Sequence, residues 1–190
     1  MATSEVVIAN RALQILGSPN RIESLAQDHP NARTMSAAYV PVRNALIRKY
    51  KWNFAKKRGS VAADAVQTTW GALNRYTLPE DFARLIRNDE TGMRLDWQIE
   101  GRFIVTKDAA PLEFKYIAII EDPNEFDPLF DEVFAHELAL ATCKEITGSN
   151  DNKADIRVDL RDALNAAKQN NAYEEDAEQP LEDDWVLARL

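Results

Sequence analysis

The chain of 190 residues contains a single cysteine, Cys143, and two histidines, His29 and His136. One cysteine cannot form an internal disulfide, and two histidines leave few candidates for metal or acid–base sites. The six glycines are never closer together than Gly92 and Gly101. Because a phosphate-binding loop needs glycines a few residues apart, nucleotide-loop enzymes are excluded.

Long apolar runs and a secretory signal are also missing. No window approaches the roughly 18 apolar residues that a membrane-spanning helix requires, and the first residues lack the charged start and apolar run of a signal peptide. We therefore expect a protein that is made in the cytoplasm and has no direct membrane role. With 45% hydrophobic and 28% charged residues, the composition is typical of a folded globular chain.

Charge is polarised along the sequence. The formal net charge is −8, and residues 173–190 hold −6 of it, with seven acidic residues and one base. Between Asp28 and Asp64 there is no acidic residue, and eight Lys and Arg residues give +8. We expect two surfaces of opposite sign rather than a uniformly acidic molecule.

Apolar residues at helical spacing predict four helices. The first covers 4–16, and the second covers about 31–51 with a bend at Pro41. The third covers 129–147 and is apolar nearly all round, as expected of a buried central helix. The fourth covers about 149–171, with Ser149 or Asn150 as its N-cap.

Between 52 and 120 the apolar period changes to two, which is typical of strands. Expected strands cover 75–78, 82–87 and 112–118. A hairpin is expected around Glu100-Gly101. We predict an odd-length loop or a bulge there, because a strict two-residue turn would split the apolar residues between two faces.

These elements predict an α+β fold in which N- and C-terminal helices form a four-helix bundle with an inserted, mainly antiparallel β subdomain. Residues 1–51 and 121–172 are assigned to the helical bundle, 52–120 to the β-rich insertion and 173–190 to an acidic C-terminal tail. The tail has too little apolar content to fold alone, but its last residues are apolar and suited to docking.

The histidines and the cysteine offer little catalytic chemistry. His136-Glu137 begins like a helical zinc motif, but Leu140 stands where the second histidine is required. We interpret His136 as a buried helix histidine satisfied by a neighbour, and Cys143 as a packing residue rather than a nucleophile. No catalytic residue, metal site or cofactor is predicted.

Three acidic pairs leave one enzymatic alternative open. They are Glu80-Asp81, Glu121-Asp122, and Glu125 with Asp127. Paired carboxylates can hydrolyse a glycosidic bond. The competing interpretation is ordinary turn chemistry, since prolines flank two of the pairs.

A basic segment carries the candidate contact residues. These are Arg43, Arg48, Lys49, Lys56, Lys57 and Arg58. Because Tyr50, Trp52 and Phe54 are interleaved with them, the segment could bind nucleic acid by stacking and charge. It could instead contact an acidic protein surface or serve only solubility. The aromatic spacing also fits a face that is buried, so all three interpretations remain open.

Several short sequence segments, which we call phrases, occur one after another along the chain. They are 9–17 (ANRALQILG), 22–25 (IESL), 32–43, 52–55 (WNFA), Trp70, 76–82 (YTLPEDF), 97–101 (WQIEG), 122–123 (DP), 126–130 (FDPLF) and 146–148 (ITG). Taken together and in this order, they resemble the tail tubular protein A family of phages. The resemblance extends to about Asn171 and fades after Tyr173.

The resemblance implies a structural virion protein and not an enzyme. Members of this family are head-to-tail adaptors that form a ring, typically dodecameric, between the portal protein and the tail nozzle protein of the tail tubular protein B type. The ring surrounds the channel for DNA ejection. The helical part would face the portal and neighbouring copies, and the β part would face the nozzle and the tail fibres. The alternatives are a virion-associated peptidoglycan or glycan hydrolase and a nucleic-acid-binding module.

The resemblance places the protein in the virion tail, below the portal vertex, as a ring of identical copies that is monomeric when free. Neither sequence-specific nucleic-acid binding nor membrane binding is expected. A ring presents different surfaces of one copy to its two neighbours, so basic and acidic regions can meet. We hypothesise that the six basic candidates contact a neighbour or the portal, and that Trp185, Leu187 and Leu190 dock into a groove on assembly.

Overall fold

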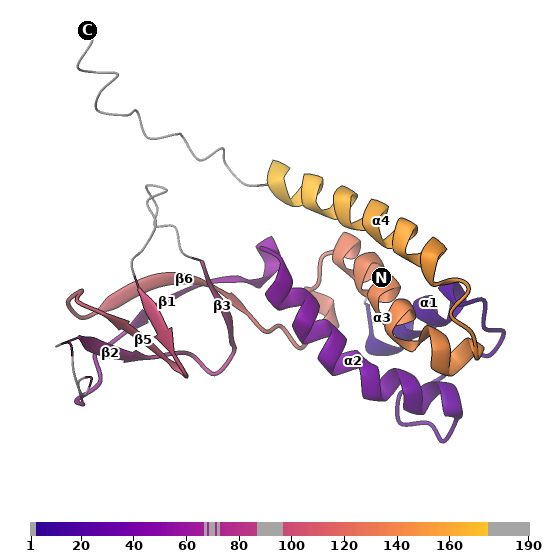
Figure 1. The fold of residues 1–190 in the computed structure, drawn as a ribbon, viewed down its shortest axis with the longest axis horizontal. Helices are drawn as coiled ribbons and strands as arrows, with labels where there is room; N and C mark the ends of the chain where they lie inside the picture. The colour runs from indigo at the N-terminus through magenta and orange to yellow at the C-terminus, as the bar shows by residue number, and fades with distance from the viewer. Residues whose placement is uncertain (1–2, 67, 69–70, 72, 87–96, 175–190) are drawn as a thin grey trace, which may run out of the picture. The chain divides into compact units, whose positions relative to one another are not determined.

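The computed structural model describes residues 3–66, 68, 71, 73–86 and 97–174 (Figure 1). They form two compact units. Of the described residues, those up to Ala55 and those from Ile119 to Glu174 belong to the helical unit, and those within Lys56–Ala118 belong to the β unit. In the described part of the chain, no helix is long and apolar enough to cross a membrane.

The helical unit is organised around one helix. Its helices are α1 (Glu5–Ile15), α2 (Pro30–Lys49), α3 (Pro128–Thr147) and α4 (Lys153–Tyr173). Each of the other three makes its principal helix contacts with α3, which lies among them in Figure 1. This position follows from the sequence of α3, since nine of its side chains are buried and they point in several directions.

The ends of α3 are defined by two local signals. The Asp127 carboxylate accepts hydrogen bonds from the backbone N–H groups of Leu129 (2.7 Å) and Phe130 (3.3 Å), which satisfies two free donors of the first turn. At the other end Gly148 adopts a left-handed conformation (φ 74°), which glycine reaches without steric cost. The predicted third helix is therefore confirmed, with its start one residue earlier.

The predicted fold class, a four-helix bundle with one inserted β subdomain, is wrong. The helices are grouped around α3 instead of sharing a common axial core, because α3 is apolar on several faces while α4 buries only Ile156 and Ala167. The strands form two separate three-stranded antiparallel sheets. The chain is α+β overall, and two helices precede the strands and two follow them.

Other helix boundaries differ slightly from the predicted ones. Ser4 caps α1 through its side-chain oxygen, which accepts from the Val7 N–H at 3.3 Å. Helix α2 continues through Pro41 as one element. Helix α4 starts at Lys153, later than expected, and its N-cap Asn152 makes no side-chain capping bond.

Six strands occur among the described residues of the β unit. They are β1 (Lys56–Val61), β2 (Asn74–Thr77), β3 (Phe82–Ile86), β4 (Gln98–Glu100), β5 (Phe103–Thr106) and β6 (Leu112–Ala118). One sheet has the order β1-β6-β3 and the other β2-β5-β4. The alternation predicted for β6 is confirmed, since Leu112, Phe114 and Tyr116 are buried. Strand β1 was not predicted, because its sequence KKRGSV has no apolar alternation.

The hairpin prediction is wrong about its loop. Glu100 pairs directly with Phe103, so the connection is the two-residue loop Gly101-Arg102, one position later than assumed. Gly101 has φ 61°, which makes it suitable for such a tight turn. Ile99 then faces Ile104 across the strands. A register shift occurs instead between Phe82 and Arg84 in β3. Two residues of the strand and family predictions, Arg87 and Trp70, lie outside the described residues.

An aromatic cluster surrounds Phe130 in the helical unit. Its ring centroid lies 5.0 Å from Trp52, 4.9 Å from Phe54, 5.0 Å from Phe126 and 5.9 Å from Phe134. We call these five residues the Phe130 cluster. The residues of the 3-10 turn Asn53–Ala55 come just before β1, and Phe126 follows the 3-10 turn Pro123–Glu125 after β6. The cluster therefore joins the segments by which the chain leaves and re-enters the helical unit.

A buried carboxyl group in the first turn of α3 makes stability dependent on pH. Burial raises the pKa of Asp131 to about 6, a hydrogen bond with Thr3 opposes the shift, and the charge of Asp127 adds to it. Asp131 Oδ1 has no hydrogen-bond partner among the described residues. The folded state therefore holds the proton more tightly than the unfolded state, and stability falls as the pH rises through the raised pKa of about 6.

We predict that Asp131→Asn stabilises the protein at neutral pH, because the amide cannot ionise. The free energy of unfolding in urea should increase by about 1–3 kcal/mol at pH ~7.5 and change little near pH ~4. Asp155→Asn, at an exposed position in the first turn of α4, is the matched control and should show no such dependence. Parallel pH profiles for Asp131→Asn and wild type would contradict this account.

Candidate interaction surface

An open groove lies between α2, α3 and α4 in the helical unit. Its volume is about 420 Å³. Apolar residues line it from all three helices, and charged residues stand beside them: Val42, Ala45, Leu46, Leu140, Ala141, Lys49, Glu137, Lys153 and Arg157. The volume falls within the range of about 300–1,000 Å³ that ligand sites occupy.

The groove exists because one face of α3 is left uncovered. Leu140 is half-buried and Ala141 is exposed, although both belong to the apolar sequence of α3. Lys153 and Arg157 are four residues apart on α4, so they lie on the same face of that helix. Lys49 lies opposite on α2 and pairs with Glu137 at 3.6 Å. The lining therefore combines an apolar floor with three basic groups and one acidic group.

Arg43 does not belong to an exposed basic surface. Its side chain is only 4% exposed, and its guanidinium lies 3.6 Å from the Glu121 carboxylate and donates to Asn44 Oδ1 at 3.0 Å. The prediction that Arg43 contacts another subunit is not compatible with this burial. The sequence contained a signal for the burial of Arg43, since this residue follows the buried Met35 and Tyr39 at helical spacing.

Arg48 and Lys49 lie in the last turn of α2 and are exposed. Basic side chains in the last turn interact favourably with the partial negative charge at the C-terminus of a helix. This interaction alone is a structural reason for their presence. The ammonium groups of Lys49 and Lys168 lie 5.3 Å and 4.5 Å from the Tyr50 ring centroid. The end of α2 therefore carries a concentration of positive charge next to the groove.

Lys56, Lys57 and Arg58 lie on β1, in the β unit. Strand β1 is at the edge of its sheet, where charged side chains commonly prevent pairing with other chains. Lys57 Nζ lies 2.8 Å from Asp81 Oδ2, and the Tyr116 hydroxyl donates to Asp81 Oδ1 at 3.0 Å. The six predicted contact residues are thus divided between the two units, three in each.

These contacts shift two pKa values in the β unit. Burial alone would raise the pKa of Asp81, but hydrogen bonds from Lys57 and Tyr116 outweigh it and hold the pKa below its ordinary value. Burial, followed by the Asp81 carboxylate, raises the pKa of Tyr116 to about 12. Asp81 is therefore an ionised partner for Lys57 and Tyr116, which is a structural role for one of the acidic pairs.

The aromatic residues of the basic segment are packed in the protein. Trp52 is 3% exposed, belongs to the Phe130 cluster, and donates its indole N–H to Leu46 O at 3.1 Å. Phe54 is half-buried in the same cluster. The stacking of bases needs accessible ring faces, so the structure weakens the nucleic-acid interpretation of this segment.

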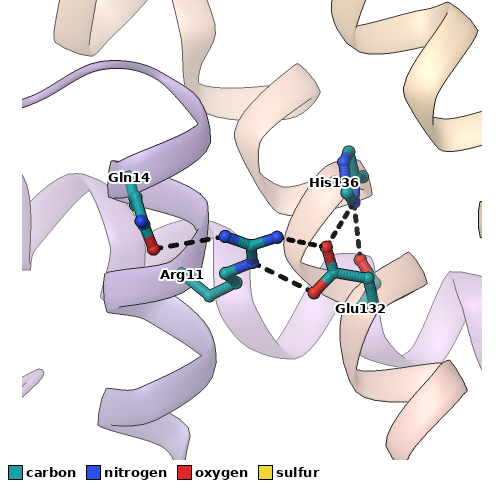
Figure 2. Close-up of polar contacts among 4 residues, drawn as sticks. All are labelled: Arg11, Gln14, Glu132 and His136. Carbon is teal, nitrogen blue, oxygen red and sulfur yellow. Dashed lines mark hydrogen bonds and ion pairs between the residues drawn. The ribbon is translucent and has the colours of Figure 1, made fainter.

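His136 takes part in a polar contact between α1 and α3 (Figure 2). Arg11 binds both oxygens of Glu132, through Nε at 3.0 Å and Nη2 at 2.6 Å, and also donates to Gln14 at 3.2 Å. His136 Nδ1 donates to the Glu132 carbonyl oxygen at 2.8 Å. The interpretation of His136 as a buried histidine satisfied by a neighbour is confirmed. Across the residues that the structure describes, no group of three or more metal-ligating side chains occurs.

Two further acidic residues serve as caps. The Asp122 carboxylate accepts from the Asn124 N–H at 2.9 Å and starts the 3-10 turn, while Asp127 caps α3. The turn interpretation is confirmed for Asp122. Cys143 is fully buried, as its interpretation as a packing residue requires. Trp185, Leu187 and Leu190 lie outside the described residues.

Comparison with models of protein families finds none that matches the chain, and comparison with curated proteins finds no match.

We predict that Arg11→Ala lowers the free energy of unfolding by about 0.5–1 kcal/mol, since the ion pair with Glu132 is bidentate but partly exposed. The hydrogen bond from Arg11 holds the pKa of Glu132 below its ordinary value, so the effect is present at neutral pH and is lost as acid protonates Glu132. Arg33→Ala breaks a longer exposed pair with Asp28 (3.6 Å) and is the control. Equal effects of the two variants in urea unfolding would exclude a role for the bidentate geometry.

Proposed function

We propose that this chain is a structural adaptor of a phage virion, which forms a ring that links the portal protein to the tail nozzle and surrounds the DNA channel. The observation that carries the proposal is the ordered series of sequence phrases that resemble the tail tubular protein A family. The structure supports treating the phrases as parts of one fold, because several of them meet in space.

Two pairs of phrases contact each other directly. In the first pair, Asn10 of the phrase 9–17 donates its amide to Ile22 O at 2.8 Å and accepts from Ile22 N–H at 2.9 Å. In the second pair, the phrases 52–55 and 126–130 are far apart in sequence but supply four of the five rings of the Phe130 cluster. The phrases therefore contain residues that stabilise the helical unit.

The division into two units supports the proposed arrangement of partners. A helical unit and a β unit, each with its own core, give one chain two separate sets of surfaces. We assign the helical unit to the portal and to neighbouring copies, and the β unit to the nozzle and fibres. Outside the basic segment and the acidic tail, the chain carries −10, which suits a channel wall that does not hold DNA.

The direct test is to mix the purified chain with portal rings from the virion whose genome encodes it. The chain alone should be monomeric by light scattering, and electron microscopy of the mixture should show a second ring of this chain on the portal. A mixture in which the portal rings stay bare would overturn the proposal. Release of soluble fragments from peptidoglycan, abolished by Asp81→Asn, would favour the hydrolase instead.

A DNA-binding assay distinguishes the adaptor from the nucleic-acid-binding module. A nucleic-acid-binding module loses affinity steeply with salt, because phosphate contacts release counterions. The adaptor should bind duplex DNA weakly at low salt and not detectably at physiological salt. Charge reversal at exposed Arg48 and Lys49, in the helical unit, should reduce ring formation on the portal more than the same change at exposed Arg21 and Arg33.

A further inference from the structure

The groove between α2, α3 and α4 has free basic groups at its rim. Lys153 and Arg157 form no ion pair with any residue that the structure describes. Glu137 is the only acidic side chain in the lining, and it lies beside Lys49 at 3.6 Å. An apolar floor with uncompensated positive charge fits a segment that carries apolar and acidic side chains together.

The C-terminal tail of this chain has that composition. Residues 175–190 contain six acidic residues and one base. Three of the acids, Glu182, Asp183 and Asp184, come directly before Trp185. In an extended segment Trp185 and Leu187 point to the same side, so both can lie on one apolar floor. Acidic and apolar side chains are therefore adjacent in the tail, as basic and apolar ones are in the groove.

The tail is long enough to reach the groove of its own chain. From Arg157 to the end of α4 at Tyr173 the helix rises about 24 Å, at about 1.5 Å per residue. The eleven Cα–Cα steps from Glu174 to Trp185 span up to about 36 Å when the chain is extended. A short tether also gives the tail a local concentration in the millimolar range, which favours the same chain over a second copy.

We propose that in the free protein this groove binds the chain's own residues 182–190, with Trp185 and Leu187 on the apolar floor and the acidic triplet Glu182–Asp184 at the rim formed by Lys153 and Arg157. This inference concerns the free chain and does not depend on the proposed adaptor function.

Paramagnetic relaxation in the full-length protein tests the proposal. A nitroxide is attached to Ala188→Cys, while the native Cys143 is fully buried and should remain unlabelled, which mass spectrometry checks. In the ¹⁵N-labelled chain that carries the nitroxide, amide signals of 42–49, 137–141 and 153–157 should lose most of their intensity. In a mixture of nitroxide-labelled unenriched chain and unlabelled ¹⁵N chain, the same signals should keep their intensity.

Matched variants distinguish binding of the tail in the groove from a general effect of net charge. Lys153→Glu with Arg157→Glu should restore the signals of 42–49 and 137–141, whereas Arg21→Glu with Arg33→Glu changes the net charge equally at exposed positions outside the groove lining and should leave the loss in place. Trp185→Ala with Leu187→Ala should restore the signals as well. Loss only in the mixed sample would identify a second copy as the occupant, and loss centred on β1 or no loss anywhere would equally overturn the proposal.

Discussion

The packing of aromatic rings on Phe130 is the constraint on which the rest of the structure depends. Phe130 is fully buried in α3, and it receives Trp52 and Phe54 from the segment that ends the first half of the helical unit. Phe126 reaches it from the segment that begins the second half. The 63 residues of Lys56–Ala118 are thus inserted between two segments that pack on the same side chain. Removing a large buried ring from such a site costs about 3–5 kcal/mol.

The elements that depend on local pattern were predictable from the sequence. Helix α3 and strand β6 have clear apolar periods and clear end signals, and the structure has both close to the predicted residues. Strand β1 has no such pattern, because its place in the sheet is fixed by pairing with β6 rather than by its own side chains. Moving the hairpin loop by one residue, from Glu100-Gly101 to Gly101-Arg102, changes which residues pair across the strands. The alternation of side chains alone could not determine that position. The grouping of helices around α3 is a long-range property and was predicted wrongly.

In the candidate interaction surface, too, local sequence pattern predicted some features and long-range packing determined the others. A basic run in the sequence indicates positive charge but not which side chains are exposed, and Arg43 is buried against Glu121 while Lys49 stands at a groove. That groove was not predicted, since Leu140 and Ala141 have the sequence character of core residues. It arises because α4 covers α3 only partly. The surfaces that are open to a partner are therefore set by tertiary packing, which apolar periodicity does not predict.

We propose that the Phe130 cluster stabilises the helical unit without any contribution from the β unit. Lys56 and Ile117 are paired across neighbouring strands, so their Cα atoms are about 5 Å apart and a linker of about four Gly and Ser residues can replace Lys56–Ala118. Urea unfolding of this variant, followed by circular dichroism, is the most direct test. The account predicts a helical protein with one cooperative transition, which Phe130→Ala abolishes. A variant that is unfolded or melts without cooperativity while Phe130 is present would contradict it.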